Sequence, residues 1–163
     1  MCYHLSVKAS LAYVKIIRQL QKNAVRKSLK HKEVYMEIQL WREILNPYDL
    51  AVKELTVKFE HLIQEHRQQG LYSPIEQVDG RVKTISSILD KAQKKNIPIN
   101  EIEEKLEDIA GIRIICQFVE DIQKVVEIIR SRTDMKVIEE KDYVSNMKNS
   151  GYRSYHMIVE YTV

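Results

Sequence analysis

The stretch from residue 106 to 118 reads LEDIAGIRIICQF, and its second half has the pattern of a strand. Apolar side chains recur there at every second position and can share one face: Ile112, Ile114, Cys116 and Phe118. Arg113 falls on the opposite face, because successive side chains of a strand alternate. Asp108 stands just before the apolar run. Mg²⁺ is usually held by one or two carboxylates together with substrate phosphates, so Asp108 is a candidate metal ligand. It is equally a candidate helix-terminus or turn residue.

The segments that follow this strand alternate in type. Residues 121–132 carry apolar side chains at helical spacing, residues 135–139 read as a strand, and residues 154–163 alternate cleanly as another strand. Strands and helices in this order predict an α+β fold in which a mixed β-sheet is flanked by helices.

The segment before the central strand, residues 81–95, has the pattern of an amphipathic helix. At about 100° per residue, Lys83, Ser87 and Lys91 line one edge, while the apolar residues fall on the other. Arg81 lies at the predicted helix start, where free backbone N–H groups favour an anion. The pattern indicates either a phosphate-binding edge or an ordinary solvated face.

The first half of the chain is predicted to be mostly helical. A helix from Trp41 is expected to break at Asn46-Pro47-Tyr48-Asp49, to resume with apolar residues at helical spacing, and to stop at Gly70. Residues 74–78 read as a short strand with Asp79-Gly80 as its turn. Residues 100–105 begin another helix, with Asn100 and Glu103 resembling a capping box.

The stretch YVSNMKNSGYRSYH, residues 143–156, is a basic and aromatic loop leading into the last strand. Gly151 permits a backbone turn that other residues avoid, and Lys148 and Arg153 supply positive charge. Tyr152 can stack on a base. The loop therefore fits a flat anionic ligand such as a nucleotide, and it also fits a solvated basic hairpin.

The composition excludes several classes of protein. Hydrophobic residues make up 44% and charged residues 30% of 163 residues, which is typical of one globular domain. Cys2 and Cys116 form no disulfide framework or metal set, which fits the reducing cytosol and a cytoplasmic protein. No apolar run approaches the roughly 20 residues that a membrane span needs. The histidines show no metal-ligand spacing.

Positive charge is concentrated at the start of the chain. Residues 1–35 carry eight Lys and Arg against Glu33 alone, whereas the whole chain has a net charge of +3. Helical spacing within 1–35 suggests an amphipathic arm that contacts membrane or RNA, or a targeting peptide. Alternatively, translation begins at Met36 and this leader is no part of the protein. The domain boundary is therefore expected at residues 35 and 36.

Three motifs in the same order resemble the synthetase domain of the RelA/SpoT alarmone enzymes. They are Gly80-Arg81-Val82-Lys83 with Ser87, then Asp108 to Arg113 (DIAGIR), then Lys141-Asp142-Tyr143 and Lys148 with Ser150 to His156 (SGYRSYH). Residues 36–163 without a further domain resemble in particular the small alarmone synthetases. The resemblance implies a nucleotidyltransferase-like fold, often assembled as a homo-oligomer, a tetramer in many members.

The resemblance also implies a reaction and a role for each matched residue. The reaction is Mg²⁺-dependent transfer of pyrophosphate from ATP to the 3′-hydroxyl of GDP or GTP, giving AMP and ppGpp or pppGpp. Arg81 and Arg113 would sandwich adenine, and Asp108 would bind Mg²⁺. The remaining matched residues would hold ATP phosphates (Lys83, Ser87, Lys91), stack on guanine (Tyr152), or face the acceptor's phosphates (Lys141, Lys148, His156).

The sequence departs from the family pattern in two places. Glu139 occupies the position where many long members have the Arg of an Arg-x-Lys-Asp motif, so that motif's acceptor preference is not carried over. Members also continue past the position of Val163 into a strand that supplies a second metal-binding Glu. The resemblance thus implies that the C-terminal part is missing and that Val163 ends an exposed edge strand.

Two other functions compete with alarmone synthesis. One is a catalytically inactive fragment that binds guanine nucleotides or RNA, motivated by the missing Glu and the basic leader. The other is a helical adaptor that uses the face around Leu55 and Phe59, although it leaves the basic loop unexplained.

Overall fold

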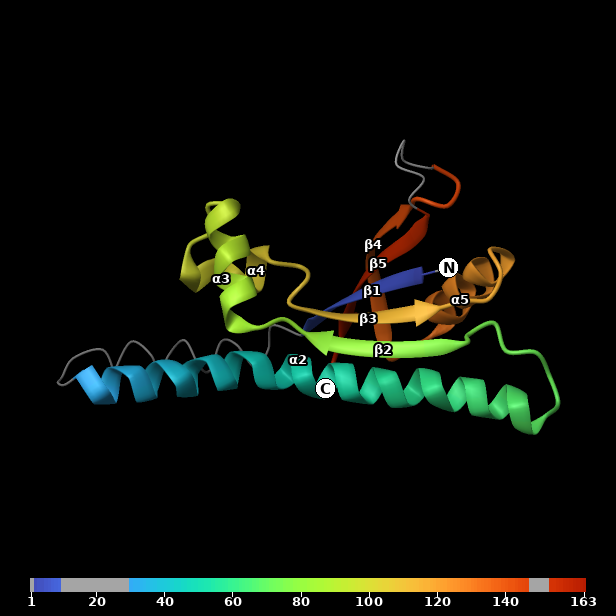
Figure 1. The fold of residues 1–163 in the computed structure, drawn as a ribbon, viewed down its shortest axis with the longest axis horizontal. Coiled ribbons are helices and arrows are strands. Elements are labelled where there is room, and N and C mark those ends of the chain that lie inside the picture. The colour runs from blue at the N-terminus through green and yellow to red at the C-terminus, as the bar shows by residue number, and fades with distance from the viewer. Residues whose placement is uncertain (1, 10–29, 147–152) are drawn as a thin grey trace.

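The computed structural model describes residues 2–9, 30–146 and 153–163, and side chains from residue 39 onward within them. It is organised around one five-stranded sheet with a long helix beneath it (Figure 1). The elements in chain order are β1 (Cys2–Ala9), α2 (Lys30–Gln68), β2 (Gln77–Val82), α3 (Ile85–Lys94), the 3₁₀ turn η1 (Ile99–Glu101), α4 (Ile102–Lys105), β3 (Ala110–Ile115), α5 (Glu120–Ser131), β4 (Met135–Asp142) and β5 (Ser154–Tyr161).

The sheet is mixed, as the sequence predicts. Its strand order is β2-β3-β1-β5-β4, with β1 and β5 parallel and every other neighbouring pair antiparallel. The prediction that the last strand is an exposed edge is wrong, because β5 pairs with β1 on one side and β4 on the other.

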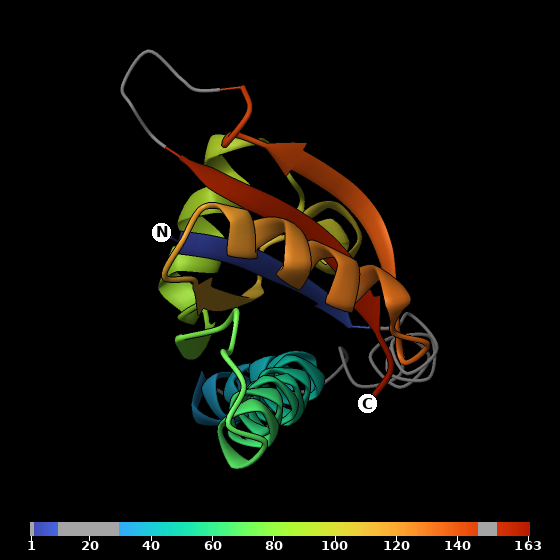
Figure 2. The same cartoon turned by 90° about the vertical axis from the view of Figure 1, so that its right-hand side faces the viewer.

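The strand β1 corrects the expectation that residues 1–35 are helical. Cys2–Ala9 lies in the middle of the sheet, between β3 and β5 (Figure 2). Apolar Tyr3, Leu5 and Val7 alternate with polar residues, which is the period of a strand. Residues 2–7 pair with β3 on one side, and residues 2–9 pair with β5 on the other. The helical expectation rests on the spacing of Leu11, Val14, Ile17 and Leu20. These four residues and most of the leader's basic residues lie outside the described residues.

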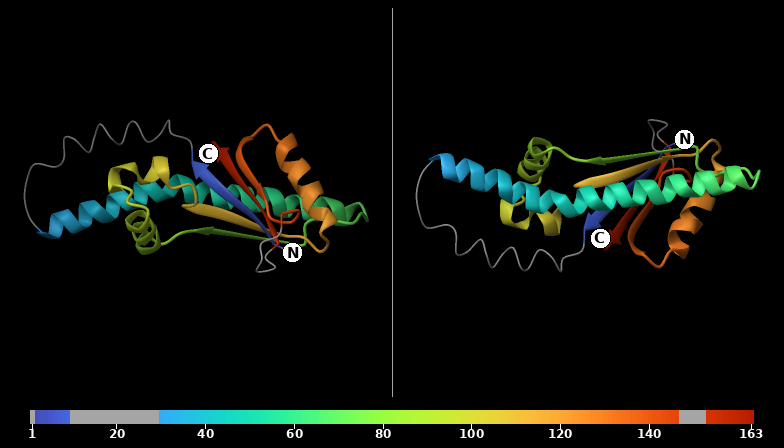
Figure 3. Two further views of the ribbon diagram at one scale, coloured as in Figure 1. Left: turned by 90° about the horizontal axis from the view of Figure 1, so that it is seen from above. Right: turned by 90° about the horizontal axis from the view of Figure 1, so that it is seen from below.

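Helix α2 is continuous through Pro47, so the expected break there is absent. Proline inside a helix costs about 3 kcal/mol. The apolar stripe continues on both sides of Pro47, from Trp41 and Tyr48 to Leu55, Phe59 and Ile63, all of them buried in the core. Packing along the sheet, which Figure 3 shows from above and below, therefore outweighs the local cost.

The end of α2 is as predicted. The helix stops at Gln68, and Gly70 adopts the positive φ of 68° that favours glycine. The backbone N–H groups of Gly70 and Leu71 donate to the carbonyls of Arg67 and His66 at 3.1 and 2.8 Å. No described helix is long and apolar enough to cross a membrane.

The segment around Gly80 is a strand and not the predicted turn. Asp79 and Gly80 lie inside β2, which packs on α2. A Cβ at Gly80 would lie 2.5 Å from Val52 Cγ1 and 2.7 Å from Thr56 Oγ1. Glycine is therefore needed here because it lets the strand backbone approach the helix.

Several other boundaries differ from the sequence predictions. Helix α3 begins at Ile85 behind Thr84, whose side chain accepts the Ser87 N–H, so Arg81 and Lys83 precede the helix. The capping box at Asn100 is not formed, since a 3₁₀ turn leads into α4 there and no side-chain cap is present. Strand β3 ends at Ile115, and Phe118 lies beyond it with an exposed side chain.

One face of the sheet is covered and the other is polar. Ile112 and Ile114 of β3 and Met157 and Val159 of β5 join a single core with α2 and α5. Helix α5 supplies the apolar residues predicted for it: Ile122, Val125, Val126 and Ile129. The alternate positions of the strands, including Arg113, point away from this core.

Candidate functional site

A carboxylate held by two lysines stands where three elements meet. Asp108 precedes β3, Lys83 follows β2, and Lys91 lies on α3. The Lys83 Nζ donates to Asp108 Oδ2 at 2.7 Å, and the Lys91 Nζ donates to the same oxygen. The three side chains are between 20% and 32% exposed. We call these three residues the Asp108 cluster.

Electrostatics keep Asp108 ionised. Burial by itself raises the pKa of this carboxyl, but the hydrogen bonds and charges of Lys83 and Lys91 outweigh burial and hold the pKa below its usual value. Two cations and one anion leave the cluster with a net charge of +1. It can therefore accept further negative charge, as phosphate would bring.

A cavity of about 260 Å³ opens beside the Asp108 cluster. Its lining includes Lys91 and Asp108 of the cluster together with Lys141 of β4 and His156 of β5. Its further lining residues are Lys95, Glu107, Glu139, Glu140, Met157 and Ile158. Residues up to 67 positions apart in the second half of the chain, from Lys91 to Ile158, thus line one cavity.

The polar face of the sheet extends this site across the strands. Arg113 of β3 pairs in register with Asp79 of β2, and His156 of β5 pairs with Lys141 of β4. Arg81 pairs with Gly111, which sets the two arginines on neighbouring strands, staggered by two residues. Side chains at such diagonal positions lie within reach of one another.

A β-bulge places Lys141 on this face. The register shifts between Val137 and Glu139, so one extra residue is inserted into β4. Without it, Lys141 would share the core side with Val137, because every second residue of a strand falls on the same face. The bulge turns Glu139 and Lys141 toward the polar face and Glu140 toward Tyr155.

The carboxylates on β4 already have partners. Glu139 contacts the Lys141 Nζ at 2.6 Å. Glu140 accepts hydrogen bonds from Arg130 and Tyr155, and Arg130 holds its pKa below the usual value although burial opposes the shift. His156 stacks edge-on with Tyr143, with ring centroids 5.3 Å apart.

The structure brings most of the predicted site residues together. Lys83, Lys91 and Asp108 converge, although Lys83 precedes the helix on which it was expected. Arg81 and Arg113 share the polar face with Lys141 and His156. Ser87 is exposed, and its hydroxyl accepts a hydrogen bond from Thr84. Lys148 and Tyr152 lie outside the described residues.

Sequence reasoning missed some of the residues around the cavity. Lys95, Glu107 and Glu140 line it but carry no motif of their own. Glu107 adjoins Asp108 and Glu140 adjoins Lys141, so proximity to predicted residues was the only available signal.

The residues present fit a Mg²⁺ ion that arrives with a nucleotide. No group of three or more His, Cys, Asp or Glu side chains that could hold a metal is found in the described part of the chain. Asp108 supplies one carboxylate, and Mg²⁺ commonly takes its other ligands from substrate phosphates and water. An isolated ion would have to displace two lysines from Asp108, whereas a nucleotide brings phosphates that those lysines can bind.

The chain resembles known proteins over this region. A family model described as the region found in RelA/SpoT proteins matches residues 80–163. The GTP pyrophosphokinase YjbM of Bacillus subtilis is 48% identical over 126 residues, which cover 77% of this chain and 59% of that protein. The chain therefore spans about three fifths of that relative's length.

Solved structures give the same result. The small alarmone synthetase 1 of Bacillus subtilis bound to its product pppGpp has a TM-score of 0.69 at 49% identity, covering 74% of this chain and 63% of that one. The same enzyme bound to AMPCPP has a TM-score of 0.61 at 40% identity, covering 77% and 72%. Because the family model covers more than half of its residues, this chain belongs to the RelA/SpoT family.

Proposed function

We propose that this chain carries the nucleotide sites of a GTP pyrophosphokinase, which transfers pyrophosphate from ATP to the 3′-hydroxyl of GDP or GTP. The observation that carries the proposal is the Asp108 cluster, where two lysines from separate elements converge on one carboxylate beside a cavity. Relatives that bind pppGpp and AMPCPP support it.

The donor nucleotide is assigned to the side of the sheet formed by β2 and β3. The guanidinium groups of Arg81 and Arg113 are flat cations suited to holding adenine between them. Lys83 and Lys91 would leave Asp108 for the phosphates of ATP. Asp108 would then be the protein ligand of Mg²⁺, which neutralises phosphate charge when it is bound.

The acceptor nucleotide is assigned to the side formed by β4 and β5. Lys141 and His156 line the same cavity as Asp108, so an acceptor bound there lies next to the donor phosphates. In the transfer, the 3′-oxygen bonds to the β-phosphorus, the bond from that phosphorus to the oxygen of AMP breaks, and the hydroxyl proton passes to water. Positioning and charge neutralisation supply the catalysis in such reactions.

The experiment that tests this proposal measures AMP release from ATP and Mg²⁺ by the 163-residue chain, with and without GDP or GTP. Release that needs the acceptor and yields a guanosine nucleotide phosphorylated at the 3′ position is the expected result. Nucleotide binding without AMP release would instead show an inactive binding fragment. Asp108→Ala is the control, in which the acceptor-dependent AMP should vanish.

Homo-oligomerisation and a cytoplasmic location complete the proposal. Resemblance to the small alarmone synthetases supports both. Light scattering on the eluting protein tests the first, since a tetramer of the 19.3 kDa chain has four times the mass of a monomer.

A further inference from the structure

Strand β4, which carries Lys141, lies at the edge of the sheet. Within the described residues it pairs with β5 alone, and its register shifts between Val137 and Glu139. Edge strands and bulges are places where the pairing of a strand can slip. A slip of one residue would turn Lys141 from the polar face to the core face, because successive side chains alternate. The position of Lys141 therefore depends on what fixes the register beyond the bulge.

Glu140 is fixed directly after the bulge by side chains from two other elements. It is paired with the buried Met157, on the core face of the sheet. The Tyr155 hydroxyl of β5 donates to Glu140 Oε2 at 2.5 Å, and Arg130 Nη2 of α5 donates to the same oxygen at 2.6 Å. Arg130 Nε donates to Glu140 Oε1 at 3.1 Å, so the guanidinium holds both carboxylate oxygens. We call Arg130, Glu140 and Tyr155 the Glu140 anchor.

The Glu140 anchor opposes a slip in either direction. Either slip would move Glu140 to the polar face, away from both donors, and would take this acceptor from the hydroxyl of the buried Tyr155. Either slip would also bring Lys141 to the core face, on the side of Arg130, where two cations repel each other. The anchor therefore favours the register in which Lys141 lines the cavity with His156.

We propose that Glu140 is a positioning residue for the acceptor nucleotide, because it holds β4 in the register that presents Lys141 to the acceptor's phosphates. This inference rests on the proposed function. The residues assigned to the donor lie on or next to β2, β3 and α3, and none of these elements carries a member of the anchor. Loss of the anchor should therefore weaken acceptor binding and spare donor binding.

The test removes the anchor without changing a residue that lines the cavity. Tyr155→Phe combined with Arg130→Met takes away both donors to Glu140, and neither residue is among those that line the cavity. Calorimetry should show GDP binding weakened by about fivefold or more, because Lys141 no longer faces the phosphates in a fixed register. Binding of a non-hydrolysable ATP analogue with Mg²⁺ should change by less than about twofold.

Tyr161→Phe is the matched control for the loss of a buried hydroxyl. Tyr161 lies on the same strand and the same face as Tyr155, but its hydroxyl donates to Glu54 of α2 at 2.6 Å. Tyr155→Phe alone should weaken GDP binding by about threefold, whereas Tyr161→Phe should change it by less than about 1.5-fold. Thermal unfolding checks that each variant is folded, and the single Tyr155→Phe variant replaces the combined one if the latter is not.

A second comparison separates positioning from general damage to the sheet. If the anchor acts through Lys141, removing it in a Lys141→Ala background should change GDP binding by less than about twofold. Wild-type GDP affinity in a folded anchor variant, or an equal loss in the Lys141→Ala background, overturns this inference alone, since the proposed function is judged by acceptor-dependent AMP release from wild type. Failure of the wild-type chain to bind GDP would overturn both.

Discussion

Two carboxylates in this protein each accept hydrogen bonds from two cationic side chains, but we propose different roles for them. Asp108 accepts from Lys83 and Lys91, and Asp134 accepts from Lys58 and Arg132. Their side chains are equally exposed, at 31% and 32%. Exposure and the number of cationic partners therefore do not separate a structural carboxylate from a functional one.

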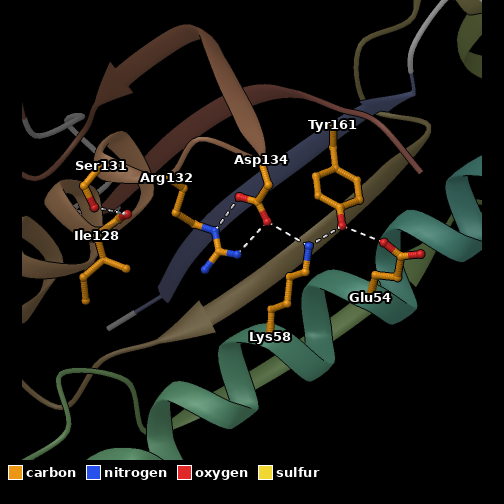
Figure 4. A network of polar contacts seen from close by, with 7 residues as sticks. All are labelled: Glu54, Lys58, Ile128, Ser131, Arg132, Asp134 and Tyr161. Carbon is orange, nitrogen blue, oxygen red and sulfur yellow. Dashed lines mark hydrogen bonds and ion pairs between the residues drawn. The ribbon is translucent and has the colours of Figure 1, made fainter.

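The charges around Asp134 are balanced. Lys58 donates to Asp134 at 2.8 Å and to the Tyr161 hydroxyl at 2.6 Å, and that hydroxyl donates to Glu54 at 2.6 Å (Figure 4). With Arg132 bound to both oxygens of Asp134, two cations match two anions. This Asp134 network is neutral and joins α2 to β5 and to the segment before β4.

The Asp108 cluster has two cations and one anion and lines a cavity, and no residue of the Asp134 network is among the lining residues of that cavity. The cavity as a whole is not cationic, because Lys91, Lys95 and Lys141 stand against Glu107, Asp108, Glu139 and Glu140. A position beside a cavity, more than a shifted pKa, therefore separates the two carboxylates. The pKa of both carboxyls is lowered, with Arg132 as the largest cause at Asp134.

The largest expected effect tests the functional side of this comparison. Asp108→Asn should lower acceptor-dependent AMP release by at least about 100-fold, because the proposed carboxylate ligand of Mg²⁺ is lost. The same change should lower stability by less than about 1 kcal/mol, since the lysines are partly solvated. Rate assays and urea unfolding on one preparation measure both. If Asp108→Asn keeps the wild-type rate of acceptor-dependent AMP release, Asp108 has a structural role like that of Asp134.

The next largest effect concerns the packing of strand β2, which carries Arg81, against helix α2. Gly80→Ala should destabilise the protein by about 1–3 kcal/mol, because the new methyl group meets Val52 and Thr56 of α2. Urea unfolding measures this loss. Gly70→Ala is the matched control for volume, since a Cβ there meets nothing within 4 Å and any cost comes from the positive φ. Unchanged stability of Gly80→Ala would show that β2 does not need this close approach.

A smaller effect tests the structural side. Asp134→Asn should cost about 1 kcal/mol at neutral pH, because its partners are partly solvated, and should leave AMP release unchanged. The folded-state pKa of Asp134 is depressed, so its contribution is present above the unfolded pKa near 3.9 and is lost as pH falls through the folded value. The variant should therefore lose less stability than wild type below about pH 4. An equal loss of stability in wild type and Asp134→Asn as the pH falls below about 4 would contradict this prediction.

The smallest effect sets a baseline for both regions. Lys53 and Asp49 form an ion pair on α2 with side chains 69% and 47% exposed. Lys53→Gln should change stability by less than about 0.5 kcal/mol, because water and salt screen such pairs. Thermal unfolding at low and high salt measures the difference. A loss as large as that of Asp134→Asn would remove the distinction between the network and an ordinary surface pair.

The sequence predicted those strands and helices in which the regularly spaced apolar residues are the ones that the fold buries. Strand β5 and helix α5 lie close to the predicted positions, and the face of β3 opposite Arg113 is buried. Residues 2–9 differ from the prediction, because they alternate like a strand although residues 11–20 have helical spacing. Pro47 differs for another reason: the packing of the whole helix outweighs the local cost of a proline.

What the sequence determined by itself is the chemistry: which residues can bind phosphate, metal or a base, and their order in the family motifs. Which of them meet was decided by the tertiary structure. Lys83 reaches Asp108 because β2 pairs with β3, and Lys141 joins the polar face because β4 contains a bulge. Strand register and order depend on contacts between distant segments, and no local pattern in the chain encodes them.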